Sequence, residues 1–362
     1  MDRGDKIVII ISGGKDMILF HNDYSEGCHQ KVLDALVRTN MEQTTGYSED
    51  GYCASAAAKI RKCCGREDLA VHFLVGGTQA NLTVITAALR PHQGVLCADS
   101  GHVNTHETGA IEATGHRVLG LPSVHGKIRA DQIREYMTNH FADPSFEHTV
   151  QPGMVYISNP TEWGTLYSKS ELEALSKACT DCGLPLFMDG ARLGYGLMAK
   201  ENDLTMADLA RLCDVFYIGG TKVGAMFGEA VVISNPMLAR DFRYIMKQRG
   251  GMLAKGRLLG VQFDALFTDD LYFEISAHAD RMAEQLRSKL EELSYEFFMP
   301  AQSNQLFPIL PRKVREYLGG KYTFIEMDKL DEDRSVCRFC TSWATKQENV
   351  DALCLDLEKI RE

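Results

Sequence analysis

The sequence of 362 residues has no long apolar run and no excess of positive charge. No stretch approaches the roughly 20 apolar residues that cross a bilayer as a helix, so no transmembrane segment is expected. The 39 Lys and Arg residues are outnumbered by 49 Asp and Glu residues, which gives a formal net charge of −10. We therefore expect neither nucleic acid nor a membrane surface as a partner, because both bind through a general positive field. A small basic pocket for one phosphate is compatible with this balance.

The chain also has no internal repeat and no low-complexity segment. Neither a G-x-G-x-x-G fingerprint nor a Walker loop occurs. Their absence disfavours a dinucleotide or ATP as ligand and argues against a dehydrogenase. The apolar stretch at residues 6–11 is shorter than the ~7–15 residues of a signal-peptide core, so it predicts a strand or an extension. A cytoplasmic protein is therefore the expectation.

Cysteine is present but sparse for a disulfide-stabilised protein. The eleven cysteines are about 3% of the chain, well below the ~8–10% of disulfide scaffolds. Their number is odd and several lie in apolar periodic runs, which indicates free thiols in a reducing compartment. Two Cys-x-x-Cys pairs occur, at residues 179–182 and 337–340. Structural zinc usually takes its ligands from a short local framework, so we expect no metal site.

What the sequence does contain is the alternation of an α/β protein. Hydrophobic residues make up 45% and charged residues 24%, which is typical of a soluble globular chain with a sizeable core. Helical stretches, one of them expected at residues 105–112, separate short apolar strands at residues 71–75, 95–98, 118–121, 154–158, 186–188, 215–218 and 230–233. This order predicts a mostly parallel sheet between helices, and continuous apolar strands indicate burial on both faces.

The pattern changes after Pro236. Two long helices are predicted at residues 237–266 and 271–293, followed by short strands and a last helix at 347–360. We expect a large domain at residues 46–264 and a smaller α+β C-terminal domain at residues 265–362. Residues 1–45 are expected to form an N-terminal segment that packs on the small domain.

Four segments place reactive residues at the ends of predicted strands, where open α/β sheets bind their ligands. In VGGTQAN (residues 75–81), Gly76 and Gly77 end a strand and Thr78 opens a helix. Glycines admit close approach, and the free N–H groups of a helix N-terminus with a hydroxyl group favour an anion such as phosphate. An ordinary turn between a strand and a helix is the alternative interpretation of this sequence.

The second segment is GHVNTHETGA (residues 101–110). His102 and His106 are four residues apart and would share one helix face. They could bind metal, but the H-E-x-x-H order is missing. An imidazole ring can also stack on a planar ligand, and a hydrogen-bonded structural histidine is the plain alternative.

The third and fourth segments bring a carboxylate and an amine to the same edge. Asp189 ends an apolar strand and is followed shortly by Arg192. A carboxylate there could hold a proton on a heterocyclic nitrogen, bind a metal or cap a helix. Lys222 follows two glycines between two apolar strands. Desolvation in such a turn favours the neutral amine that attacks carbonyl groups, although a solvent-facing turn lysine would look similar.

Together the four segments meet the needs of pyridoxal 5'-phosphate. Gly76, Gly77 and Thr78 could hold the phosphate, and His102 could cover the ring. Asp189 could pair with the ring nitrogen, and Lys222 could bind the aldehyde. The conjunction of the four is more specific than any one of them.

At this point the sequence resembles a known family, the β-eliminating lyases and low-specificity L-threonine aldolases, which are fold type I pyridoxal-phosphate enzymes. The resemblance runs from about Asn22 to Leu357, and its motifs are GGTQAN, the His102 segment, DGAR (189–192) and Lys222. NDYSEG (22–27) and TTGYSEDGY (44–52) are similar to the family's N-terminal signatures. The resemblance implies the transferase-like fold of these enzymes, with a large cofactor-binding domain and a small C-terminal domain.

The resemblance also implies roles for residues outside the four segments. Tyr47 would approach the cofactor from a neighbouring subunit, and Asn22 would lie at the substrate. Arg338, in VCRFCTSW (336–343), would clamp the substrate carboxylate. Arg192 would lie near the cofactor ring and the substrate. Each active site would be shared within a homodimer or homotetramer.

Two positions depart from the family's pattern. Where threonine aldolases carry a histidine linked with the substrate's β-hydroxyl group, this chain has Thr161 or Glu162 in SNPTEWGT (158–165). His106 could take the place of that histidine. The arginine that reaches the phosphate from a second subunit has no clear counterpart, and Lys255 or Arg249 could serve.

The resemblance implies a lyase that acts on a small amino-acid substrate. Our first expectation is aldol cleavage of a β-hydroxy-L-amino acid to glycine and an aldehyde. The alternative is β-elimination on an (aromatic) amino acid, as in tyrosine phenol-lyase and tryptophanase. A class V-like aminotransferase is a weaker third alternative. A non-catalytic relative is disfavoured because Asp189, Lys222 and Arg338 are all present.

Overall fold

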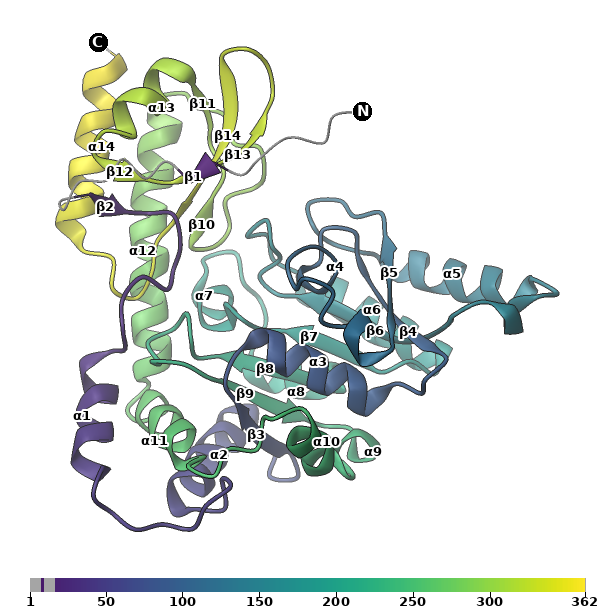
Figure 1. Cartoon of the computed structure of the whole chain (residues 1–362). Helices are drawn as coiled ribbons and strands as arrows, with labels where there is room; N and C mark the ends of the chain where they lie inside the picture. Colours follow the sequence, from purple (N-terminus) through teal and green to yellow (C-terminus); the bar gives the residue numbers. More distant parts are fainter. Residues whose placement is uncertain (1–7, 10–16, 362) are drawn as a thin grey trace.

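A central sheet dominates the computed structural model, which describes residues 8–9 and 17–361 (Figure 1). In this part of the chain the sheet has seven strands in the order β3-β9-β8-β7-β6-β4-β5. The strands are β3 (Ala70–Leu74), β4 (Gln93–Ala98), β5 (Arg117–Leu121), β6 (Gln151–Ser158), β7 (Leu186–Asp189), β8 (Val215–Gly219) and β9 (Glu229–Ile233). Strands β5, β4, β6, β7 and β8 are parallel, and β9 runs antiparallel to both β8 and β3. The predicted α/β class with a mostly parallel sheet is confirmed.

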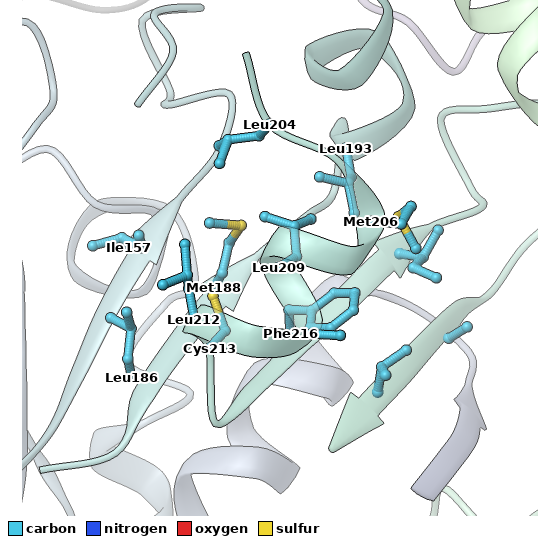
Figure 2. Close-up of a cluster of buried hydrophobic side chains, with 14 of the residues drawn as sticks. Ile157, Leu186, Met188, Leu193, Leu204, Met206, Leu209, Leu212, Cys213 and Phe216 are labelled. Atoms are coloured by element: carbon cyan, nitrogen blue, oxygen red, sulfur yellow. The ribbon is translucent and has the colours of Figure 1, made fainter. Parts of the chain in front are cut away.

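Alternate residues of the strands enter two separate cores. On β6, Val155 and Ile157 belong to the core on one face, whereas Met154 and Tyr156 belong to the core on the other. The first face is covered by α2 (Gly51–Cys64), α5 (Ala130–Ala142), α6 (Lys169–Cys182), α8 (Met206–Leu212) and α11 (Arg257–Leu266). Figure 2 shows side chains of α8 against strand residues such as Ile157 and Met188. The second face is covered by α3 (Gly77–Ala88) and α10 (Phe242–Gln248). Burial on both faces explains the continuous apolar strands of the sequence.

The C-terminal part packs around one long helix, α12 (Leu271–Glu292), which was predicted at 271–293. A third core joins this helix to smaller elements: β10 (Gln305–Leu306), β11 (Ile309–Pro311), α13 (Arg312–Leu318), β12 (Tyr322–Thr323), β13 (Ile325–Lys329), β14 (Arg334–Cys340) and α14 (Gln347–Arg361). In Figure 1, α12 runs from the helices beside the large sheet up into this group.

The N-terminal segment pairs with these C-terminal strands. Strand β1 (Val8–Ile9) is antiparallel to β13, and β2 (Ile18–Leu19) is parallel to β12. Phe20 is fully buried in the C-terminal core, and α1 (Gln30–Thr39) lies against α11. The strand predicted at residues 6–11 is thus present at Val8–Ile9, and its other residues lie outside the described ones. The domain limits at 45/46 and 264/265 stay a prediction.

Two predicted helices are wrong. Residues 237–266 form three helices, α9 (Pro236–Ala239), α10 and α11. Asp241 (φ 62°) separates α9 from α10, and Gly250 (φ 73°) follows the end of α10, because both residues take the left-handed backbone conformation. Residues 105–112 contain only the end of α4 (His102–Thr105) and the start of a 3₁₀ turn (Glu112–Thr114). Thr108 and Gly109 have positive φ values of 54° and 72°, which no α-helix accommodates.

Short elements complete the large part of the chain: the 3₁₀ turn Phe146–His148 and α7 (Leu193–Met198). All eleven cysteines are free thiols, as predicted. Among the described residues, no helix combines the length and the apolarity that a bilayer crossing needs.

Candidate active site

A cavity of about 380 Å³ opens where β3, β6, β7 and β8 end. It brings together eight of the residues that the sequence predicted for the site. These are Gly76, Gly77, Thr78, His102, Thr161, Asp189, Arg192 and Lys222. The carboxyl ends of the strands therefore converge as the α/β pattern predicts.

One end of the cavity is formed by the start of α3. Gly76 precedes the helix, and no side chain of the described residues caps its first turn. The first backbone N–H that bonds within the turn is that of Ala80, which donates to the carbonyl of Gly76. The preceding N–H groups, including that of Thr78, are available to an anion. A Cβ atom on Gly77 would lie 3.0 Å from the hydroxyl oxygen of Tyr217, so this position favours glycine.

Asp189, the last residue of β7, is buried and lines the same cavity. Its Oδ2 accepts hydrogen bonds from the hydroxyl of Tyr156 (2.6 Å) and the amide of Asn81 (3.1 Å), and its Oδ1 accepts from the backbone N–H of Ala191 (2.9 Å). Burial by itself would raise the pKa of Asp189. The nearby charge of His102 and the hydrogen bonds outweigh burial and hold the pKa below its usual value. Asp189 is therefore a buried carboxylate that stays ionised.

His102 is fixed by a buried acid that sequence reasoning missed. Its Nδ1 lies 2.8 Å from Oε1 of Glu107, and the amide of Asn81 donates to the same oxygen (2.7 Å). Burial opposes protonation of His102, but Glu107 and Asp189 raise its pKa above the usual value. Glu107 is five residues after His102, a spacing that carries no recognised signal. Asn81 was inside the GGTQAN motif but had no assigned role.

His106 lies outside the lining of the cavity, beside His102. The two rings are stacked, with centroids 5.8 Å apart and planes inclined by 24°. The Nδ1 of His106 lies 2.6 Å from the hydroxyl of Thr105. Partial burial lowers the pKa of His106, and the charges of His102 and Arg338 lower it further. The imidazole of His106 is thus kept neutral next to a cationic neighbour.

Lys222 lies on the turn between β8 and β9, at the middle of the cavity. The hydroxyl of Tyr195 donates to its backbone carbonyl (2.5 Å) and fixes the turn. Burial lowers the pKa of Lys222, and the charge of Arg192 lowers it further. The amine is therefore more readily neutral than an exposed lysine, as its position in the sequence predicted.

Arg192 also lines the cavity, but it is paired with a partner that the sequence did not reveal. Its Nε and Nη2 donate to the two carboxylate oxygens of Asp23 (2.6 and 3.0 Å). The amide of Asn304 donates to the same carboxylate (2.9 Å). Burial would raise the pKa of Asp23, but Arg192 and Lys222 hold it below its usual value. Asp23 is the second residue of the NDYSEG motif, which was the available signal.

Thr161 and Glu162, one of which was expected in place of the family's histidine, both line the cavity. Oε1 of Glu162 accepts from the hydroxyl of Ser158 (2.6 Å) and from the backbone N–H of His102 (2.9 Å). Burial raises the pKa of Glu162. The hydroxyl of Thr161 lies 2.7 Å from that of Thr165.

Arg338 and Asn22 are outside the lining. Arg338 donates from Nη2 to the backbone carbonyl of His21 (3.1 Å), while its buried Nε has no hydrogen-bond partner. The side chain of Asn22 accepts from the N–H of Tyr24 and the hydroxyl of Ser25, both at 2.9 Å. Asn22 thus holds a turn, and it faces a different hollow from the cavity.

Tyr47 and Lys255 are also away from the cavity of their own chain. The backbone N–H of Tyr47 donates to the carbonyl of Ala254 (3.2 Å), so the two segments lie side by side. The ring of Tyr47 is 44% exposed, with Nζ of Lys247 at 4.9 Å from its centroid. Tyr47 and Lys255 therefore share one exposed surface.

Comparisons with known proteins agree with this geometry. Residues 23–311 match the model of the beta-eliminating lyase family. A low-specificity L-threonine aldolase from Pseudomonas sp. (strain NCIMB 10558) is 31% identical over 94% of this chain and 97% of its own length. The solved structure of a threonine aldolase from Leishmania major is 46% identical, with a TM-score of 0.92, and covers 95% of this chain and 100% of that chain.

The fold itself extends further. An aspartate aminotransferase variant from Thermus thermophilus has a TM-score of 0.69 at 16% identity, covering 96% of this chain and 92% of that chain. This similarity concerns the fold alone. The family model and the two aldolases span most or nearly all of the chain, and on that basis the protein belongs to the beta-eliminating lyase family.

Proposed function

We propose that the protein is a pyridoxal-phosphate-dependent lyase that cleaves the Cα–Cβ bond of a β-hydroxy-L-amino acid and releases glycine and an aldehyde. The observation that carries the proposal is the cavity in which Lys222, Asp189 and the uncapped start of α3 meet. The relatives named threonine aldolases support the choice of reaction.

The residues of the cavity fit the cofactor by their chemistry. The free N–H groups before Ala80 and the hydroxyl of Thr78 suit its phosphate. Asp189, a carboxylate kept ionised by its donors, suits a protonated ring nitrogen. His102 offers a flat face, and Lys222 offers an amine with a lowered pKa. When bound, the cofactor supplies an electron sink for the negative charge that develops on Cα.

The residues of the chain would then divide the work. Lys222, as a free amine, would accept and return protons beside Cα. Asp189 would hold the proton on the ring nitrogen. Glu107 would keep His102 in one orientation, because its carboxylate is shared between His102 and Asn81.

The substrate's own groups need partners as well. We assign the substrate carboxylate to Arg338, whose buried Nε lacks a hydrogen-bond partner. Asn22, two residues before the cavity residue Tyr24, would support the substrate indirectly through the turn that it holds. Arg192 would orient the bound substrate while Asp23 holds the guanidinium. For the β-hydroxyl group of the substrate, we assign His106 as the proton acceptor, because its imidazole is kept neutral. Thr161, which lines the cavity, would lie beside the same hydroxyl group.

We also propose that the active enzyme is a homodimer or homotetramer with shared sites. Tyr47 and Lys255 form one exposed surface and do not line the cavity around Lys222 of their own chain, so a second copy could receive them at its phosphate end. Mixing inactive Lys222→Ala with inactive Tyr47→Phe or Lys255→Ala protein should restore activity, because a hybrid keeps one intact site. A monomeric mass at working concentration would contradict shared sites.

The experiment for the proposed reaction is product analysis on a panel of amino acids. Purified enzyme with pyridoxal phosphate should convert threonine-like substrates to equal amounts of glycine and aldehyde, and Lys222→Ala should not. Borohydride reduction followed by peptide mapping should place the modified residue at Lys222. Pyruvate-type products instead of glycine would indicate β-elimination, and a modified peptide lacking Lys222 would contradict the site.

A further inference from the structure

Glu229 is a cavity residue that the reaction described above does not use. It is the first residue of β9, and it pairs with Leu74 at the end of β3 and with Gly219 at the end of β8. The chain leaving β3 leads to Gly76–Thr78, and the chain leaving β8 leads to Lys222. Glu229 therefore lies between the segment assigned to the phosphate and the lysine assigned to the aldehyde.

The side chain of Glu229 points to the same face of the sheet as α3. Residues two apart on a strand share a face, and Val231 belongs to the core under α3. Oε2 of Glu229 accepts from the backbone N–H of Gly220 (3.0 Å), and the hydroxyl of Thr221 is a second hydrogen-bond partner. The residue is 3% exposed and lines the cavity.

Two cations of the cavity are already paired with other carboxylates. Arg192 is bound through two nitrogens to Asp23, and His102 is bound to Glu107. Among the described residues Lys222 is the remaining nearby cation, and burial lowers its pKa. A carboxylate at Glu229 would therefore be only weakly compensated, and it would stand beside the place where a phosphate enters.

Burial raises the pKa of Glu229 to about 8. The hydrogen bonds from Thr221 and Gly220 and the charge of Lys222 oppose this rise, and Asp189 adds to it. The elements packed around Glu229 bring other titratable groups: Tyr217 from β8, Tyr272 from α12, Asp189 from β7 and Lys222 from the turn after β8. The residues of α11 that lie against Gly228, the residue before Glu229, are the apolar Leu259 and Phe263. At neutral pH the side chain is thus an uncharged acid, which can donate a hydrogen bond.

We propose that Glu229 is a further cofactor-binding residue whose protonated carboxyl group donates a hydrogen bond to the phosphate of bound pyridoxal phosphate. The inference rests on the proposed function, because it needs the phosphate at the start of α3. It follows that the proton on Glu229 is held more tightly when the phosphate is bound. By linkage, affinity for pyridoxal phosphate falls as pH rises above the pKa of Glu229 in the free enzyme.

The test compares pyridoxal phosphate with pyridoxal, which has the same aldehyde and ring but no phosphate. Dissociation constants for the cofactor-free enzyme are measured by absorbance between pH 7.5 and 9.5, above the second phosphate pKa of about 6. The ratio of the two constants cancels the titration of Lys222 and of the ring. For the wild type, the ratio of the dissociation constant of pyridoxal to that of pyridoxal phosphate should fall by up to about tenfold per pH unit above pH 8.

Glu229→Gln keeps an uncharged side chain but cannot titrate. For this variant the ratio of the two dissociation constants should not change over this pH range. The control Glu67→Gln, at an exposed glutamate, should behave as the wild type. A Glu229→Gln protein with the wild-type slope would overturn the inference. So would a variant that changes pyridoxal binding as much as pyridoxal phosphate binding, because Glu229 would then act on Lys222.

A second measurement needs no variant. At pH 8.5, binding of pyridoxal phosphate to the wild type should take up more protons than binding of pyridoxal, as a pH indicator in weak buffer reports. Equal proton uptake would overturn the role of Glu229 while leaving the proposed function intact. Failure of the wild type to bind pyridoxal phosphate at any pH would overturn both.

Discussion

Two buried carboxyl groups that line one cavity differ in their charge. Asp189 is 4% exposed and Glu229 is 3% exposed, and both line the cavity. Burial pushes the pKa of each upward. Nevertheless the pKa of Asp189 ends below its usual value, whereas that of Glu229 rises to about 8. Burial alone therefore does not decide whether an acid in this protein is ionised.

The difference comes from what surrounds each carboxyl group. Asp189 accepts from Tyr156, Asn81 and the N–H of Ala191, and the charge of His102 is close. Glu229 has a backbone N–H and one hydroxyl as partners. Hydrogen bonds and a cation stabilise an ionised acid, and too few of them leave it neutral. The ionised Asp189 suits a protonated ring nitrogen, and the neutral Glu229 suits an anion.

The largest effect on turnover should come from removing the negative charge of Asp189. Asp189→Asn cannot hold the ring proton, so we expect turnover to fall by about 10²-fold or more, within the ~10²–10⁴-fold range of positioned proton-holding groups. Cofactor binding should change much less, because the phosphate end is intact. Steady-state kinetics with cofactor content measured by absorbance checks this result. Asp181→Asn, at an exposed carboxylate of α6, is the control, and equal turnover in the two variants would refute the assignment.

The carboxylate of the substrate is a third negative group, and we expect Arg338 to bind it. A charge-assisted hydrogen bond contributes roughly 1.5–3 kcal/mol, so Arg338→Ala should raise KM about 10–100-fold with a smaller change in kcat. Initial rates over a range of substrate concentrations separate the two constants. Arg312→Ala serves as the control, because Arg312 of α13 is exposed and donates to the carbonyl of Glu332. An unchanged KM would remove Arg338 from the site.

The smallest change would make Asp189 more like Glu229. Tyr156→Phe removes one donor, so the pKa of Asp189 should rise and its ionised form should be lost at a higher pH. Loss of about 1.5–3 kcal/mol corresponds to roughly 1–2 pH units, so the acid limb of kcat/KM should move upward by that amount. Tyr167→Phe is a matched control, because Tyr167 is also buried but its hydroxyl accepts from the N–H of Ile128 instead. An acid limb that moves in both variants, or in neither, would contradict the account.

The sequence was sufficient for the parts of the site that depend on strand order. Apolar strands that end in Asp189, in Gly76 or shortly before Lys222 must deliver these residues to one edge of a parallel sheet, and they line one cavity. Pairing partners were not predictable in the same way. Glu107 meets His102 across the end of α4, which stops at Thr105 instead of continuing as the predicted helix.

The burial of Glu229 was also not predictable from the sequence. In the sequence it is a charged residue at the start of an apolar strand, which reads as an exposed strand end. Its burial depends on the antiparallel register that sets it opposite both Leu74 and Gly219. The surface shared by Tyr47 and Lys255 likewise depends on the contact of Tyr47 with Ala254, across more than half the chain. Long-range register and side-chain orientation are not encoded in local patterns.

The most direct measurement of the central claim is an infrared difference spectrum of the cofactor-free enzyme between pH 6.5 and pH 9.5. The carbonyl band of a protonated carboxylic acid should be present at the lower pH and lost at the higher one, with a midpoint near pH 8. The part of this band that is lost near pH 8 should be absent in Glu229→Gln and retained in Asp189→Asn, because burial raises the pKa of Glu229 to about 8 whereas Asp189 is ionised. A band that is still lost near pH 8 in Glu229→Gln, or that is no longer seen in Asp189→Asn, would contradict the account of two differently charged carboxyl groups in one cavity.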